Sequence, residues 1–206
     1  MEKNNKIAAP MAHYTALYKN LDPHFAAARC DIAFENGVFA LTLFGKPINI
    51  TFPEFHVYNP AEPDVDFPYD VALLLIRYIL EGAGGNLSGK FLSYSEIPWG
   101  QVYLENFKGR CLKRLAFSFG FDLPRFERAC IALGGVAVEG SAKVGDASYD
   151  IEFLGGLIIR VILWAPDEEF PPNSQILFSD NFPMAFSAED LSVVGDVLIN
   201  ALKRVK

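Results

Sequence analysis

Apolar residues recur every three or four positions between residues 9 and 20, and this spacing predicts a helix. Asp22 followed by Pro23 is typical of a helix start and predicts a second, short helix that ends near Arg29. From residue 31 to 53 the pattern changes to alternating apolar and polar positions, with Asn36-Gly37 and Gly45-Lys46 between the apolar stretches. Because Asn-Gly between alternating residues is a strong hairpin signal, this segment predicts an antiparallel meander.

The middle of the chain, residues 68–134, predicts helices around one short strand. PYDVALLLIRYILEG predicts an apolar helix that stops at Gly82. KFLSY has strand composition, and residues 101–118 return to helical spacing. Asp122 then predicts the N-cap of a further helix, LPRFERACIAL, which stops at Gly134-Gly135.

The last part of the chain predicts sheet followed by one helix. VAVEG, ASYDIEFL, LIIRVILWAP and QILFS have strand composition, and Gly155-Gly156 predicts a turn between the second and third of them. Ser187 and Asp190 have the spacing of a capping box, and apolar residues then stripe one face of the final helix.

These segments predict one α+β domain over residues 1–206, with mainly antiparallel sheet and about five helices packed on one side. Its parts are N-terminal helices (1–30), a β-meander (31–53), a helical middle with one strand (68–134) and a β-rich segment with the C-terminal helix (136–206).

Composition narrows the classes of function. Hydrophobic residues make up 51% of the chain and charged residues 21%, which is ordinary for a folded protein. A net charge of −7 argues against nucleic-acid binding, since neutralising phosphates needs a clustered basic surface. The chain has no apolar run long enough to span a membrane and no signal-peptide pattern. We therefore expect a cytoplasmic protein that does not bind a membrane.

The cysteines and histidines form no recognisable metal motif. Cys30, Cys111 and Cys130 are far apart and include no C-x-x-C, so we expect buried, reduced thiols and no iron–sulfur cluster bound by this chain alone. The histidines also lack the spacing of a zinc site. They are His13, His24 and His56, the last of which could pair with Asp64 or Asp66.

The stretch GGNLSGKF, residues 84–91, matches seven of the eight positions of the phosphate-binding pattern G-x-x-x-x-G-K-[ST]. Its eighth residue is Phe91, which cannot ligate Mg²⁺. A phosphate-binding loop lies between a strand and a helix, whereas this stretch lies between a predicted helix and a predicted strand. We therefore expect a turn, and no nucleotide at Gly84 to Lys90.

The stretch WAPDEEFPP is the first candidate site. Asp167, Glu168 and Glu169 begin where the strand LIIRVILW ends, and carboxylates at a strand end could hold Mg²⁺ or Ca²⁺. On an extended chain only Asp167 and Glu169 would face the same side. The structural alternative is that Phe170 plugs the core while the prolines stiffen the loop and the acids keep it solvated.

The stretch IPWGQ is the second candidate site. Tyr94, Trp99 and Tyr103 could wall a ligand cleft with Trp164 opposite. The structural alternative is that these aromatic residues pack at the rim of the core, with their N–H and O–H groups bonded to nearby carbonyls.

Three stretches, SGKFLSYSEIPWGQVYLENF, GDASYDIEFLGGLIIRVILWAPDEEFPPNSQILF and AEDLSVVGDVLINAL, together resemble a prokaryotic family described only as a domain of unknown function, number 3786. The resemblance covers nearly the whole chain from about Asp31, and D-E-E-F-P-P is its most specific element. It implies that Ser88-Gly89 belongs to a structural turn. The chain departs from the family pattern at Ser179, where the family tends to have Asp, and near Ala185, where it tends to have Tyr.

The resemblance also implies a metabolic setting. Some relatives carry a neighbouring iron–sulfur module and look associated with anaerobic one-carbon or corrinoid metabolism. An iron–sulfur or corrinoid-related protein is therefore a possible partner.

Three functions remain open. The leading hypothesis is a cytosolic, non-catalytic module that binds a small ligand, a cofactor or a redox partner through the DEEFPP loop and the Trp99 region. The second is a metal-dependent enzyme with Asp167 and Glu169 as ligands. The third is a structural interaction protein that acts through its apolar C-terminal helix.

Overall fold

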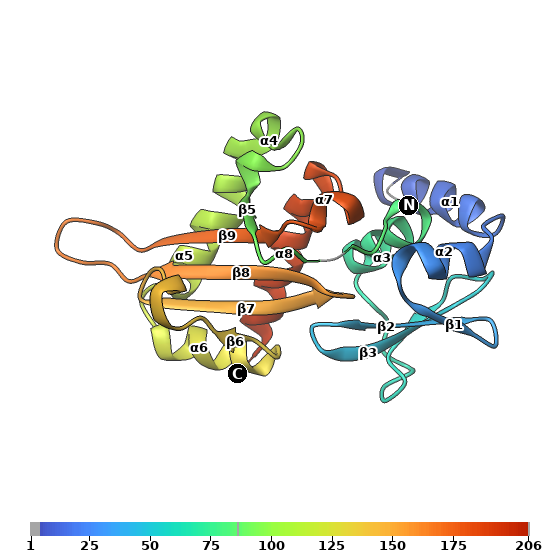
Figure 1. The fold of residues 1–206 in the computed structure, drawn as a ribbon, viewed down its shortest axis with the longest axis horizontal. Helices are drawn as coiled ribbons and strands as arrows, with labels where there is room; N and C mark the ends of the chain where they lie inside the picture. Colours follow the sequence, from blue (N-terminus) through green and yellow to red (C-terminus); the bar gives the residue numbers. More distant parts are fainter. Residues whose placement is uncertain (1–4, 86, 206) are drawn as a thin grey trace.

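The computed structural model describes residues 5–85 and 87–205, which form two lobes side by side (Figure 1). The N-terminal lobe ends with helix α3, and the C-terminal lobe begins with strand β5. The strands of both lobes belong to one sheet in the order β4-β3-β2-β7-β8-β9-β5, with β1 paired to β2 and β6 paired to β7. All described pairs are antiparallel, which confirms the predicted α+β class.

The N-terminal lobe packs helices against the predicted meander. Asp22 caps α2 by accepting hydrogen bonds from the backbone N–H groups of His24 and Phe25, as the Asp-Pro pair predicts. The elements are α1 (Asn5–Tyr18), α2 (Pro23–Cys30), β1 (Ala33–Glu35), β2 (Val38–Leu43), β3 (Lys46–Thr51), β4 (Val57–Tyr58) and α3 (Tyr69–Glu81).

The C-terminal lobe begins with a strand and a helical run. Asp122 caps α6 by accepting a hydrogen bond from the backbone N–H of Arg125, as the sequence predicts. The elements are β5 (Phe91–Ser93), the 3₁₀ turn η1 (Tyr94–Glu96), α4 (Gly100–Phe107), the π-helical segment η2 (Lys108–Lys113), α5 (Arg114–Phe119) and α6 (Leu123–Ala132).

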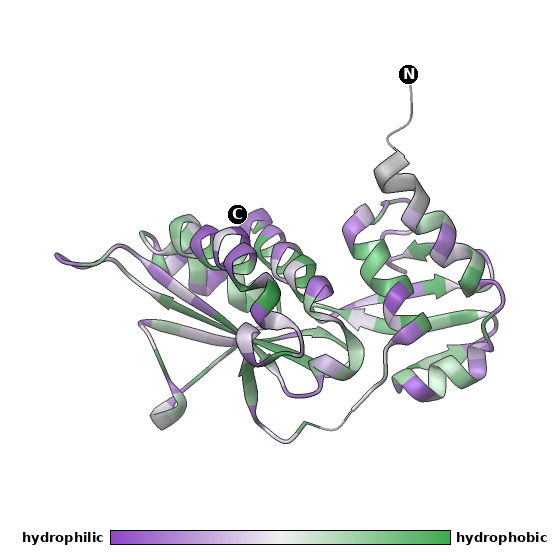
Figure 2. Cartoon of the chain, turned by 90° about the horizontal axis from the view of Figure 1, so that it is seen from above, coloured by the Kyte–Doolittle hydropathy of each residue, from purple (hydrophilic) through white to green (hydrophobic). Residues whose placement is uncertain are grey.

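The rest of the C-terminal lobe supplies the long central strands and the last helix. Figure 2 shows the long helices of this lobe gathered over one face of the strands. The elements are β6 (Val136–Ala137), the 3₁₀ turn η3 (Gly140–Ala142), β7 (Ala147–Leu154), β8 (Leu157–Trp164), β9 (Asn173–Ser179), α7 (Phe182–Ala185) and α8 (Ala188–Arg204). The sequence pattern does not predict the short α7.

The apolar face of α8 lies in the core of this lobe. Leu191, Val194, Leu198 and Leu202 are all 0% exposed. The helix begins with the predicted capping box, in which the Ser187 hydroxyl accepts a hydrogen bond from the Asp190 backbone N–H. The apolar stripe of the C-terminal helix is therefore used inside the protein.

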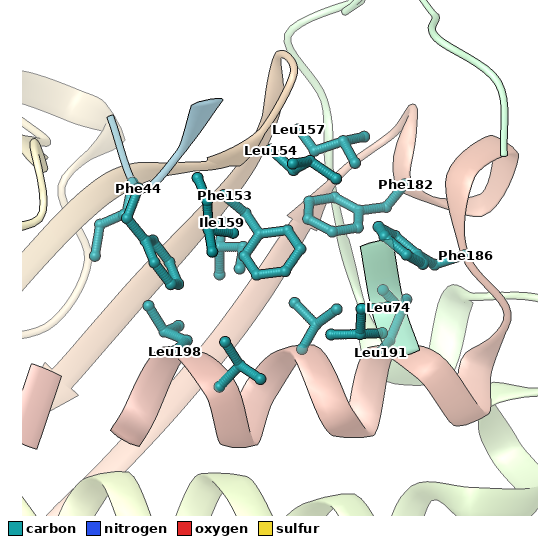
Figure 3. Close-up of a cluster of buried hydrophobic side chains, with 14 of the residues drawn as sticks. Phe44, Leu74, Phe153, Leu154, Leu157, Ile159, Phe182, Phe186, Leu191 and Leu198 are labelled. Atoms are coloured by element: carbon teal, nitrogen blue, oxygen red, sulfur yellow. The ribbon is translucent and has the colours of Figure 1, made fainter. Parts of the chain in front are cut away.

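The lobes meet at a narrow, strongly apolar junction. Between β2 and β7 the sheet has one paired position, Leu43 with Leu154, extended by a hydrogen bond from the Phe44 N–H to the Phe153 carbonyl at 3.1 Å. Phenylalanine and leucine side chains from both lobes fill the space between β7 and α8 (Figure 3). Those labelled are Phe44, Leu74, Phe153, Leu154, Leu157, Ile159, Phe182, Phe186, Leu191 and Leu198.

A partly buried ion pair also crosses the junction. Arg77 on α3 contacts the carboxylate of Asp190 at the start of α8. The Asp190 side chain is 7% exposed and also accepts a hydrogen bond from the Ser187 hydroxyl at 2.6 Å. The boundary between the lobes falls between α3 and β5, inside the segment predicted as the helical middle.

Among the described residues, no helix combines the length and the apolar character that a bilayer crossing would require.

Candidate functional site

The DEEFPP loop joins β8 to β9 and projects at the end of the C-terminal lobe that is far from the N-terminal lobe (Figure 1). The Asp167 carboxylate accepts hydrogen bonds from the backbone N–H groups of Glu169 at 2.8 Å and Phe170 at 2.7 Å. The Asp167 N–H donates to the Phe170 carbonyl at 3.0 Å. Four residues therefore form a closed turn, because aspartate bonds readily to the backbone two and three residues ahead.

Phe170, the last residue of this turn, lies outside the core. Its side chain is 65% exposed, so the structural expectation that Phe170 plugs the core is wrong. Pro172 is the buried residue of the loop, and a Cβ added at Gly120, at the end of α5, would overlap it. The glycine at the end of α5 thus allows the loop to pack directly on this helix.

Hydrogen bonds at both ends of the loop fix its position. The Ala165 N–H donates to the Asp146 carboxylate at 2.7 Å where β8 ends. The Ser174 hydroxyl donates to the Leu112 carbonyl at 2.7 Å where β9 begins. Leu112 belongs to the π-helical segment η2, and such segments are frequent at functional sites.

Beside the loop lies an open groove of about 950 Å³, which we call the DEEFPP groove. Phe117 on α5 is 60% exposed, so with Phe170 it brings a second large apolar side chain to the groove. The charged residues at its walls are Lys113, Asp146 and Asp167. The full lining is Lys113, Phe117, Asp146, Trp164, Ala165, Pro166, Asp167, Phe170, Pro171, Pro172 and Asn173.

The carboxylates of the three loop acids, Asp167, Glu168 and Glu169, do not converge on one point. Hydrogen bonds from the backbone N–H groups of Glu169 and Phe170 lower the pKa of Asp167 below its usual value. Glu168 and Glu169 are exposed, and no group of three or more His, Cys, Asp or Glu side chains within residues 5–85 and 87–205 is close enough to hold a metal ion. The Asp167 carboxylate is thus engaged in closing the turn.

The Trp99 region forms a second, smaller hollow at the start of α4. Trp99 is 79% exposed and has φ 66°, a left-handed conformation that is rare for a bulky residue. The next residue is Gly100, where a Cβ would overlap the Tyr94 carbonyl oxygen. The hollow measures about 250 Å³ and is lined by Ile97, Pro98, Trp99, Tyr103, Pro183, Phe186, Ser187, Ala188 and Glu189.

Tyr94 lies under this hollow as a core residue. It is 2% exposed, its ring stacks on Phe107 with centroids 4.0 Å apart, and its hydroxyl donates to the Ala188 carbonyl at 2.7 Å. Burial raises the pKa of the Tyr94 hydroxyl. The Tyr94 hydroxyl is bonded to a carbonyl, as the structural alternative expects, but the ring lies in the core and not at its rim.

The structure does not bring the two candidate sites together. Trp164 lines the DEEFPP groove, whereas Trp99 and Tyr103 line the hollow at α4. Figure 1 shows α4 and the β8–β9 loop in separate places on the C-terminal lobe. Trp164 is therefore not the opposite wall of the Trp99 hollow.

The stretch GGNLSGKF, of which Asn86 lies outside the described residues, connects the lobes. It runs between α3 and β5, as the sequence predicts, so no helix begins at its end. The Gly84 N–H donates to the Arg29 carbonyl at 2.8 Å, and the Ser88 N–H donates to the Asp180 carboxylate at 3.3 Å. Asp180 thus bonds to the turn that the family resemblance implies at Ser88-Gly89.

The three cysteines are free and buried in different parts of the core. Burial raises the pKa of Cys111 to about 12, so its thiol stays protonated at neutral pH. Each histidine ring contacts a different aromatic neighbour, and none belongs to a group of three or more potential metal ligands among the described residues. The neighbours are Tyr14 for His13, Phe34 for His24 and Tyr58 for His56.

A third hollowed region, made of two adjoining hollows, lies between the lobes, and the sequence does not predict it. It is bordered by the β2–β3 turn, the loop at Phe67 and the end of α8. The end of α8 is more than 100 residues from the other two segments along the chain, as the positions of Phe67 and Ala201 show. The local signal that could have drawn attention to it is Phe44 beside Gly45, a bulky residue at a tight turn.

Comparison with protein families assigns the chain to one of them. The family model described as "Domain of unknown function (DUF3786)" matches residues 22–201, and the chain therefore belongs to this family, as its motifs indicate. No curated protein and no solved structure matches the chain.

Proposed function

We propose that this DUF3786 protein is a cytosolic, non-catalytic binding module that holds a partner protein at the DEEFPP groove. A cofactor-carrying or redox protein is the class of partner that the family resemblance suggests. The observation that carries the proposal is the pair of phenylalanines, Phe117 and Phe170, held 60% and 65% exposed at the walls of the same groove.

Exposing these rings opposes the hydrophobic effect. A buried Phe side chain contributes about 1.5–3 kcal/mol relative to an exposed one, so exposed rings gathered at one place favour a binding surface. The loop that carries Phe170 is fixed by the closed turn at Asp167 and by the packing of Pro172 on Gly120. A ring held rigidly loses little conformational entropy when a partner covers it.

The shape of the groove favours a protein over a small molecule. Small-molecule sites enclose most of their ligand, whereas this groove is wide and its aromatic walls face solvent. The walls carry one cation, Lys113, and two carboxylates, Asp146 and Asp167. Glu168 and Glu169 are exposed on the same loop, so acidic groups predominate at the groove. We expect the partner to present an apolar side chain flanked by Lys or Arg.

The polar groups at the groove support a binding role without catalysis. The carboxylates of Asp146 and Asp167 accept hydrogen bonds from backbone N–H groups and so hold the loop in place. Catalysis by general acid and base needs groups that reach the reacting atoms. These two carboxylates already perform a structural task.

The test is partner capture from anaerobic cell lysate with three immobilised proteins. They are the wild type, the double variant Phe117→Ser/Phe170→Ser and the control Phe25→Ser, whose ring on α2 is 64% exposed in the other lobe. We expect one protein to be retained by the wild type and the control, and to be reduced at least about 10-fold by the double variant. Retention of the same proteins by all three would contradict the proposal.

A further inference from the structure

A groove runs between the two lobes and is separate from the DEEFPP groove. It consists of two adjoining hollows of about 350 and 140 Å³, which we call the interlobe groove. The turn between β2 and β3 and the loop before α3 form one side, and the last turns of α8 form the other. The residues common to both hollows are Leu43, Phe44, Phe67, Ala201 and Arg204.

Apolar side chains that belong to the core form the floor of the interlobe groove. Leu43, Phe44 and Val71 of the N-terminal lobe are each 7–8% exposed. Val197 and Leu133 of the C-terminal lobe are 5% and 8% exposed. The floor is therefore preformed, because both lobes already pack these residues against the junction.

Strained backbone shapes the N-terminal wall. Phe44 has φ 49° and Gly45 has φ 70°, as in the two central residues of a type I′ hairpin turn. A positive φ is energetically unfavourable for a bulky residue, so this conformation persists only where the surrounding structure enforces it. Here the Phe44 ring packs edge-on against Phe153 across the junction, with centroids 5.4 Å apart, and the turn places Lys46 at the wall of the groove.

Two cations from different lobes line the interlobe groove. Lys46 comes from the start of β3 and Arg204 from the end of α8, and both are exposed. Neither forms an ion pair with any residue in the part of the chain that the structure describes. Asp70 lines only the smaller hollow, where its carboxylate accepts a hydrogen bond from the Val71 N–H at 3.0 Å at the start of α3.

We propose that the interlobe groove binds a small amphiphilic anion. Its carboxylate or phosphate group lies between Lys46 and Arg204, and its apolar body lies on Leu43 and Phe44. Such a ligand neutralises two unpaired cations and covers the apolar floor, and the Asn59 side chain in the same hollow can add a hydrogen bond. Because it touches both lobes, it also stabilises their arrangement.

The first arm of the test measures binding of three probes of equal length by calorimetry at low salt. The probes are octanoate, octan-1-ol and octylamine. We expect octanoate to bind saturably and at least about 10-fold more tightly than the other two, since only its head group is attracted by the cations. Octylamine binding as well as octanoate, or no saturable binding of any probe, would overturn the proposal.

The second arm locates the site with surface variants that leave the core intact. Lys46→Gln and Arg204→Gln should each weaken octanoate binding about 10-fold. The matched control is Lys203→Gln, because Lys203 is exposed on the same helix turn but does not line the groove. Equal affinities for all three variants would place octanoate elsewhere and refute the site.

The third arm separates a free anion from a lipid head group. Wild-type protein is mixed with vesicles of neutral lipid and of lipid containing phosphatidylglycerol, and flotation is measured with and without octanoate. We expect no flotation with either vesicle. Flotation with the anionic vesicles that disappears in Lys46→Gln/Arg204→Gln would show that the cations bind a membrane surface, and would contradict the proposal. None of these readouts involves the DEEFPP groove, so failure here leaves the proposed function untouched.

Discussion

The junction between the lobes and the DEEFPP groove are both rich in phenylalanine, but the side chains are buried at the junction and exposed at the groove. At the junction Phe44, Phe153 and Phe182 are 7%, 1% and 0% exposed. At the groove Phe117 and Phe170 are 60% and 65% exposed. Aromatic residues therefore contribute to folding stability in the first region and are available for binding in the second.

An aspartate organises each region, again with opposite surroundings. Asp190 is buried at the junction, where it contacts Arg77 of the other lobe. Asp167 lies at the exposed turn, where its partners are backbone N–H groups two and three residues away. The comparison shows that the same residue type joins distant segments in one place and shapes a local loop in the other.

The largest expected effect is at the junction. Asp190→Ala leaves the partly buried Arg77 without its main anionic partner, so we expect a loss of about 3–5 kcal/mol in the free energy of unfolding, measured by urea denaturation. The control is Glu189→Ala, an exposed acid in the same helix turn, which should cost less than about 1 kcal/mol. Equal losses in the two variants would mean that the ion pair adds nothing across the junction.

A smaller effect is expected where the DEEFPP loop packs on α5. Gly120→Ala introduces a Cβ that overlaps Pro172, and relieving this overlap should cost about 1–3 kcal/mol and displace the loop. Gly109→Ala is the matched control in the same helical run, because a Cβ there meets no atom within 4 Å. It should raise stability by about 0.5–1 kcal/mol, since alanine is the better helix former.

The two glycine variants should change the unfolding temperature in opposite directions, and thermal unfolding curves measure this difference. A Gly120→Ala protein as stable as the wild type would show that the loop is not seated on α5. The exposure of Phe170 would then not be fixed, and the groove would lose the rigid wall on which the proposed function depends.

The smallest effect is local and depends on pH. The pKa of Asp167 is lowered by the backbone N–H bonds, so the charged form stabilises the turn above the usual aspartate pKa of about 3.9. This contribution is lost as the pH falls through the lowered pKa. Amide exchange at Glu169 and Phe170 should therefore become faster below about pH 4, relative to the rest of β8 and β9.

The control for this titration is Asp167→Asn. Its amide oxygen can still accept both hydrogen bonds but does not titrate, so the relative exchange rates should stay constant with pH. If the wild type and the variant respond alike to pH, the carboxylate is not the group that closes the turn.

Several features of the fold follow from short stretches of sequence. The caps at Asp22, Asp122 and Ser187 and the turns at Asn36-Gly37 and Gly155-Gly156 are found where the sequence predicts them. Each depends on hydrogen bonds between residues at most four positions apart. Such signals are visible in the chain itself because they need no distant partner.

The candidate site was only partly predictable for the same reason. The sequence marks the DEEFPP stretch as a loop at a strand end, but not the direction of Phe170, because that depends on Pro172 meeting Gly120 more than 50 residues earlier. It marks Tyr94 and Trp99 alike as aromatic, but their exposures of 2% and 79% depend on the left-handed backbone at Trp99 and the close approach at Gly100.

The sequence by itself determined the α+β class, the order of most helices and strands, and the family to which the chain belongs. Only the tertiary structure decided that the strands divide into two lobes, that the candidate aromatic residues line separate hollows, and that Lys46 and Arg204 share a groove. The physical reason is the range of the interactions. Caps and turns form within a few residues, whereas exposure and grooves arise where segments more than 100 residues apart, such as Leu43 and Leu154, come into contact.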